Sequence, residues 1–234
     1  MNKLNMILLG LSLLLLLAAL PASAAENNVS KLIVQGEGKL NAAPDVATVV
    51  LGVETQNASA SGAAAENAIL MNETISALRA AGIADREMQT SSYSLTTAPE
   101  EEPKTAGAAP KAPTFIASNL VTVKLNDTGK VGLVLDAAVS AGSNSIQSVS
   151  FDIRNPQPEK DGALTLAIED ARRKAEVAAK AAGVKLGKIL EISEGYGYVS
   201  AAAPKNLAFS RDATPIQPGE MEVTASVTVT YMVS

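Results

Sequence analysis

The side chains that most often do chemistry in proteins are unevenly represented in this chain. It has no His and no Cys among 234 residues, so it offers no imidazole base, no thiolate and no His or Cys ligand for zinc. A Ser–Lys dyad or a pair of carboxylates is the chemistry that remains open to it. No motif places such groups at a catalytic spacing, so we assign no catalytic, cofactor-binding or metal-binding residue. We expect no cofactor and expect that the chain is not an enzyme.

The stretch Gly36-Glu37-Gly38-Lys39 is the first candidate for a phosphate-binding loop. Such a loop turns successive backbone N–H groups toward the ligand at the N-terminus of a helix. Here the third glycine of G-x-G-x-x-G is missing, no Gly-Lys-Ser/Thr element follows, and the next pattern is that of a strand. We interpret the glycines as conformational, relaxing a strand end, with Pro44 and Asp45 starting the next strand.

The most acidic stretch, Glu100–Glu102, could attract a calcium ion. It lies in a segment rich in Pro, Ala and Glu, and it lacks the alternating ligand spacing of an EF-hand loop. We therefore predict a solvated acidic loop there and no metal site.

The basic residues of "EDARRKAEVAAK" suggest a nucleic-acid surface at first sight. Each of three cations, however, follows an acidic residue by four positions, which is the favourable order for ion pairs on one helix. The predicted pairs are Glu169–Arg173, Asp170–Lys174 and Glu176–Lys180. This pattern predicts an exposed helix face with internal ion pairs and no binding of nucleic acid.

The first residues have the three parts of a secretory signal. Lys3 gives the positive start, residues 4–20 are apolar, and Ala22-Ser23-Ala24 after Pro21 fits a signal-peptidase site. We predict a signal peptide at 1–24, and a retained membrane anchor is the alternative, because the apolar run is nearly long enough to span a bilayer. The mature chain is expected to be extracytoplasmic, in the periplasm, in the cell envelope or secreted, with no membrane span.

Charge and cysteine content limit the mature chain further. Loss of Lys3 leaves 18 Lys and Arg against 24 Asp and Glu, a net charge of −6. An acidic chain gains nothing from counterion release on nucleic acid, which excludes that class of partner. With no Cys there are no disulfides and no lipoprotein anchor, so packing alone must stabilise the chain.

Period-two and period-3.6 patterns alternate along the mature chain. Helices are predicted at 59–82, 127–142 and 159–182, and each ends in a glycine suited to a left-handed cap: Gly82, Gly142 and Gly183. Strands are predicted at 31–38, 44–54, 86–97, 114–125, 146–153, 185–195 and 220–233. In the third helix we expect a buried apolar stripe made by Leu164, Ile168, Ala171, Ala175, Ala178 and Ala182.

Half-polar alternating strands with interspersed helices indicate an α+β fold. We expect an antiparallel or mixed sheet covered by helices mainly on one face. The length suits a single domain at 25–234, with flexible loops near 98–113 and 199–219. Aromatic residues are only 3% of the chain, so the core is expected to be thin, built of Val, Leu, Ile and Ala.

Five short motifs recur as a set in one known family: Gly36-x-Gly38, Pro44-Asp45, Tyr93, Ala117-x-Asn119 and Ala171-Arg172-x-Lys174-Ala175-Glu176. By these motifs the chain resembles the SIMPL-domain family, whose members include an exported periplasmic immunogenic protein and an oxidative-stress defence protein. The resemblance covers the chain from about residue 31 to its end, and Phe115 stands where that family commonly has Tyr. The resemblance implies an exported α+β protein linked to stress tolerance, protein association and self-assembly, with no established catalytic residue. We expect Asn119 to act structurally, bonding backbone across the sheet.

Two functions are compatible with these observations. The first is an exported cell-envelope protein that acts through self-assembly or contact with an envelope partner, favoured by the thin core and by a clean final strand available for pairing. The second is an extracytoplasmic small-molecule binding module or an atypical Ser/Lys/carboxylate hydrolase. A deep, convergent polar pocket would favour the second.

Overall fold

The computed structural model describes residues 29–98, 113–202, 214 and 216–234. The predicted signal peptide, the stretch Glu100–Glu102 and much of the two predicted loops lie outside the described residues.

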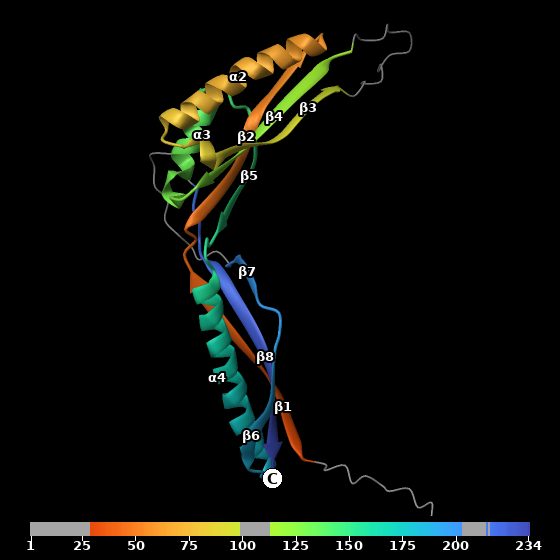
Figure 1. Ribbon diagram of the computed structural model, residues 1–234, viewed down its shortest axis with the longest axis vertical. Coiled ribbons are helices and arrows are strands. Elements are labelled where there is room, and N and C mark those ends of the chain that lie inside the picture. The colour runs from red at the N-terminus through yellow and green to blue at the C-terminus, as the bar shows by residue number, and fades with distance from the viewer. Residues whose placement is uncertain (1–28, 99–112, 203–213, 215) are drawn as a thin grey trace, which may run out of the picture.

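One sheet is built from consecutive strands, in the antiparallel order β3-β4-β2-β5. These strands are β2 Val46–Asn57, β3 Met88–Thr97, β4 Phe115–Leu125 and β5 Ser145–Asp152. The helices α2 Ala60–Ala80 and α3 Val131–Ser140 cover one face, and the 3-10 helices η1 Asp85–Glu87 and η2 Thr128–Lys130 precede β3 and α3. We call this part the upper half (Figure 1).

The other sheet pairs the first and the last strand of the described part of the chain. Its strands are β1 Lys31–Ala42, β6 Leu186–Glu194, β7 Tyr198–Ala201 and β8 Met221–Val233. They run antiparallel in the order β1-β8-β6, and β7 pairs with the N-terminal part of β8. Helix α4 Gln157–Ala182 lies along β1 and β8, and we call this part the lower half (Figure 1).

The α+β class and the antiparallel pairing predicted from the sequence are confirmed. The strands form two sheets, however, where we expected one. Alternation along a strand reports which face is buried but not which strand lies beside it. Strands β1 and β2 are neighbours in sequence and yet belong to different sheets, at the two ends of an elongated, bent molecule (Figure 1).

The last strand, β8, is not available for pairing, contrary to our expectation. It is the central strand of the lower sheet, with β1 along one edge and both β6 and β7 along the other. Strand β7 itself lies partly within the segment predicted as a loop at 199–219.

The helices begin and end where their capping residues stand. Ser59 Oγ accepts a hydrogen bond from Gly62 N at the start of α2, and Asp127 Oδ1 accepts one from Gly129 N at η2. Gly82, Gly142 and Gly183 all have positive φ, so the predicted left-handed termini are confirmed.

Each half has its own apolar core. The upper core joins the inward residues of β2 and β4 to α2 and α3, and its fully buried members include Leu51, Val53, Leu78, Val123 and Val134. The lower half holds two smaller clusters, one around Val227, Val229 and Tyr231 and one around Ile153 and Val223. No helix in the described part of the chain is both long enough and apolar enough to span a membrane.

Candidate functional site

The two glycines of the candidate phosphate loop lie in the interior of β1, opposite Val227 and Ala225 of β8. A Cβ added to Gly36 would lie 2.0 Å from Ala167 O, and one added to Gly38 would lie 1.9 Å from Ala163 O. No side chain fits there, because the backbone of α4 occupies the space. The prediction that these glycines relax a strand end is wrong, because they lie inside β1 and have no positive φ. Their lack of a side chain instead lets α4 approach the strand.

This close approach also corrects the stripe predicted for α4. The buried residues are alanines at steps of four, namely Ala163, Ala167, Ala171, Ala175 and Ala179. Ala171 and Ala175 were predicted, whereas Ile168 is 38% exposed. We favoured the larger apolar side chains, but a helix seated on glycines has room only for small ones. We call this contact between α4 and β1 the glycine–alanine seam.

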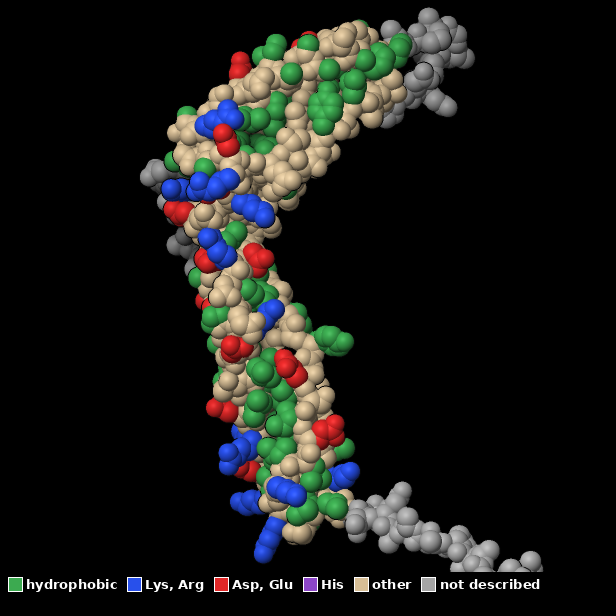
Figure 2. Space-filling view, in the orientation of Figure 1, with side chains coloured by type: hydrophobic (Ala, Val, Ile, Leu, Met, Phe, Trp, Pro, Cys, Tyr) green, Lys and Arg blue, Asp and Glu red, His purple; other side chains and the backbone are tan. Residues whose placement is uncertain are grey.

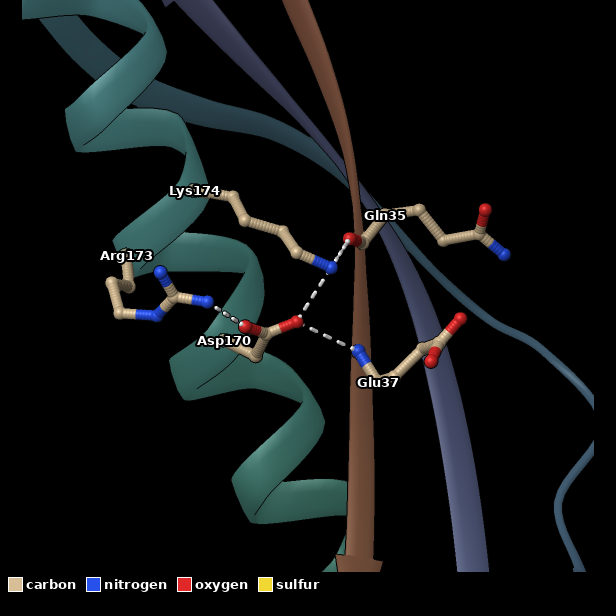
Figure 3. Close-up of polar contacts among 5 residues, drawn as sticks. All are labelled: Gln35, Glu37, Asp170, Arg173 and Lys174. Atoms are coloured by element: carbon tan, nitrogen blue, oxygen red, sulfur yellow. Dashed lines mark hydrogen bonds and ion pairs between the residues drawn. The ribbon is translucent and has the colours of Figure 1, made fainter.

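A cluster of charged side chains borders the seam (Figure 3). Asp170 Oδ2 accepts a hydrogen bond from Glu37 N, at 3.1 Å, and pairs with Lys174 Nζ at 2.7 Å. Lys174 Nζ also donates to Gln35 O at 2.9 Å, and Arg173 pairs with the other carboxylate oxygen. Helix side chains thus satisfy main-chain groups on the edge of β1 that faces away from β8, where a further strand would otherwise pair.

The same contacts favour the ionised form of Asp170. The hydrogen bond from Lys174, then the Glu37 N–H and then Arg173 hold the pKa of the Asp170 carboxyl well below its usual range. The side chain of Asp170 is only 20% exposed.

Only one of the three ion pairs predicted on α4 forms, that of Asp170 with Lys174. Arg173 pairs with Asp170 and not with Glu169, and Glu176 pairs with Arg172, at 3.1 Å, and not with Lys180. The spacing rule places side chains near one another on a helix but does not choose among several partners.

Asp45 connects two segments that run between the halves. Its Oδ1 accepts a hydrogen bond from Arg154 N at 2.7 Å, and its N–H donates to Asp152 O at 3.1 Å. The chain passes from β1 to β2 beside Asp45 and from β5 to α4 beside Arg154. Pro44 and Asp45 do precede β2, as predicted. The hydrogen bonds of Asp45 also hold the β1–β2 segment against the β5–α4 segment.

Asn119 does not bond backbone across the sheet as we expected, because its Oδ1 is buried with no hydrogen-bond partner among the described residues. Asn67 of α2 takes that role, with Nδ2 donating to Val53 O on β2 and Ala117 O on β4. Asn144 similarly continues the β2–β5 ladder, since its amide both accepts from and donates to the Glu54 main chain. Sequence reasoning missed both, because an Asn in a helix or at a strand start shows no pattern of its own.

The two edges of the upper sheet are β5 and β3, and β3 is the longer strand. Strand β3 carries no charged residue from Met88 to Thr97, and every residue after Met88 is exposed. Tyr93 is 55% exposed and Leu95 is 42% exposed, although they point to the face that α2 covers farther along the sheet. In Figure 2, uncharged side chains cover the outer part of β3 and β4, and charged side chains of the upper half gather nearer its junction with the lower half.

A hollow of about 430 Å³ lies between β5 and β7. Its described lining is Val149, Ser150, Phe151, Asp152, Val199, Ser200, Ala201, Pro218 and Met221. Asp152 is the only ionisable residue in that lining, and its Oδ1 accepts a hydrogen bond from Ile153 N. The hollow therefore holds neither a carboxylate pair nor a Ser–Lys pair among its described residues.

No group of three or more Asp or Glu residues in the described part of the chain is arranged to hold a metal ion. The expectations of no metal, no cofactor and no catalysis stay predictions.

This geometry defines an α+β protein of two antiparallel sheets. Side chains of a helix bond the outer edge of one strand, and other sheet edges have no such cover in the described part of the chain. The chain belongs to the SIMPL family, described as "Protein of unknown function (DUF541)", which matches residues 32–231. The resemblance noted in the sequence is therefore confirmed.

Two named proteins are similar to this chain over most of its length. The chain is 31% identical over 233 residues to the "26 kDa periplasmic immunogenic protein" of Brucella melitensis, covering 91% of this chain and 90% of the relative. It is 28% identical over 198 residues to "Uncharacterized protein YggE" of Escherichia coli K12, covering 84% and 78%. The periplasmic location of the Brucella proteins confirms the predicted extracytoplasmic localisation.

Proposed function

We propose that this chain is an exported, non-enzymatic protein of the cell envelope that acts through self-assembly or contact with a protein partner, and that it contributes to stress tolerance. The observation that carries the proposal is the set of large apolar side chains left exposed on open strands. Besides Tyr93 and Leu95 on β3, it includes Ile189 and Ile192 on β6, at 47% and 50% exposure. Tyr93 and Leu95 lie two residues apart on one face of β3, and neighbouring exposed apolar side chains among polar ones are typical of protein contact sites.

The thin core adds a second argument. Alanines make the whole buried face of α4, so this helix buries little apolar area per residue. Association would add burial that this helix does not supply. The absence of His and Cys supports a role without catalysis, because the commonest nucleophile–base pairs are missing.

The binding-module alternative is supported only by the hollow between β5 and β7. Ligand sites of this size usually converge several polar groups on an enclosed space. Here one carboxylate, already bonded to a main-chain N–H, and two serines line the hollow. We therefore rank this function second.

Light scattering coupled to size-exclusion chromatography tests the proposal on the mature chain over a wide range of concentrations. We expect a mass above that of one chain that rises with concentration. A single-chain mass throughout, together with no neighbour found by crosslinking in the native envelope, would contradict it. Survival of host cells with and without the chain under oxidant tests the stress role separately.

A further inference from the structure

The open edges of the two sheets are not equally protected. The outer edge of β1 is occupied by Asp170 and Lys174 of α4. Strand β6 carries Lys188, Glu191 and Glu194 and has two register irregularities against β8, features that oppose edge pairing. Strand β5, the other edge of the upper sheet, has a register shift against β2, ends in Asp152 and lines the hollow that it shares with β7. Strand β3 has one register shift, between Thr90 and Ser92, but it carries no charge, and no helix in the described part of the chain lies along its outer edge (Figure 1).

The hydrogen-bond pattern shows which groups of β3 face outward. Ala98 N donates to Thr114 O, and β3 is in regular register with β4 from Ser92 to Thr97. Main-chain groups alternate along an antiparallel ladder, so those of Ser94 and Thr96 point to β4. The N–H and C=O groups of Tyr93 and Leu95 therefore point away from the sheet, and they make no hydrogen bond within the described part of the chain.

The exposed side chains of β3 fit a second copy of the same strand. If two copies pair antiparallel about a two-fold axis at Ser94, Tyr93 of each lies opposite Leu95 of the other. That register joins the outward main-chain groups of both residues and places the aromatic ring beside the aliphatic side chain on one face. A two-fold contact uses the same patch twice, so it must be self-complementary, and an uncharged strand meets no like charge across the axis.

We propose that two copies of this chain associate through antiparallel pairing of their β3 edges, centred on Ser94. This inference rests on the proposed function and names the surface through which self-assembly takes place. The contact joins residues 92–96 of each strand, which is a small interface, so the association depends on concentration. It also joins the upper sheets of the two copies into one continuous sheet.

Single cysteines test the register, because the natural chain has no Cys. In Ser94→Cys the two thiols meet at the axis as a non-hydrogen-bonded pair, where Cα atoms are about 4.5 Å apart. In the matched control Ser92→Cys, each thiol lies four positions from its copy, about 13 Å away. Disulfides need Cα atoms within about 7 Å. Mild oxidation of the purified mature protein should give covalent dimer at least tenfold faster for Ser94→Cys than for Ser92→Cys.

A second variant tests the edge itself. Leu95→Pro removes an outward N–H and keeps the hydrogen bonds to β4, because proline is tolerated on an edge whose N–H faces solvent. We expect it to weaken association at least tenfold by light scattering, with Leu95→Val close to wild type. Equal crosslinking of the two cysteine variants overturns the β3 pairing, and so does unchanged association of Leu95→Pro.

The outcomes separate this inference from the proposed function. If the wild-type chain assembles but Ser94→Cys crosslinks no faster than Ser92→Cys, self-assembly stands and the β3 surface is rejected. A wild-type chain that is monomeric at every concentration rejects both. If the Ser94→Cys variant forms a disulfide with a different protein in the envelope and gives no homodimer, the proposal is also overturned, and the β3 edge is assigned to another chain.

Discussion

Asp170 shows how much one side chain contributes when it serves two elements at once. Its carboxylate accepts hydrogen bonds from a strand N–H and from cations on its own helix. The sequence indicated the pair with Lys174 by its spacing. It could not indicate the bond to Glu37, because that contact depends on how α4 lies across β1, which no local pattern encodes.

We predict that Asp170→Asn lowers the Tm by a few degrees near neutral pH, because Lys174 and Arg173 lose their anion. The folded pKa of Asp170 lies below the unfolded value of about 3.9. Its stabilisation is therefore complete above that value and is lost as the pH falls toward the folded one. The difference in Tm between wild type and variant should be constant from about pH 7 to about pH 5 and narrow near pH 3.

Thermal unfolding followed by circular dichroism over this pH range provides the measurement. The control is Glu169→Gln, which removes a neighbouring exposed carboxylate that makes no ion pair in the described part of the chain. It should change the Tm little at any pH. A difference for Asp170→Asn that does not vary with pH would mean that the charge is not its cause.

At the scale of elements, the glycine–alanine seam explains why the sequence predicted α4 well and its buried face poorly. The limits of the helix follow from the local signals at its ends, including Gly183. The buried face depends on a partner strand more than a hundred residues away in sequence. Hydrophobic patterns favour large side chains, whereas backbone contact at Gly36 and Gly38 selects alanine.

We predict that Gly38→Ala destabilises the protein by about 1–3 kcal/mol, because its Cβ would overlap Ala163 O and push α4 from the sheet. Urea unfolding gives the free energy. The matched control is Gly162→Ala within α4, where the added Cβ meets only Leu40 Cδ1 at 3.1 Å. That change should be neutral or stabilise by up to about 1 kcal/mol, since Ala favours helix over Gly. Equal stability of both variants would disprove the close contact.

The candidate contact surface on β3 could be predicted only in part. The absence of charge from Met88 to Thr97 is visible in the sequence and fits an unprotected edge. Which strand forms an edge is not visible, because edge and centre differ by their neighbours and not by their alternation. The final strand has the cleanest alternation in the chain, and it is a central one.

At the scale of the whole molecule, two chain segments join the two sheets, one from β1 to β2 and one from β5 to α4. Asp45 of the first segment forms hydrogen bonds with the second. We predict that Asp45→Ala costs about 1 kcal/mol and exposes the Arg154 amide to rapid hydrogen exchange, because its acceptor is lost. Asp45→Asn keeps an oxygen acceptor and should retain slow exchange at Arg154. Exchange measured by mass spectrometry on peptides containing residue 154 tests this. Slow exchange in the alanine variant would show that the side chain is not what protects this amide.

The order of the strands has a consequence for how the protein is made. The strands of the upper sheet follow one another in sequence, and Val46 and Asp152, at its two ends, are paired neighbours. The lower sheet instead joins β1, which is synthesised first, to β8, which is synthesised last. While the chain is being exported, the upper sheet has all its strands long before β1 meets its partner. The most N-terminal strand must then wait unpaired for the C-terminus, so any truncation at the end of the gene removes the centre of the lower sheet and leaves the upper strands intact.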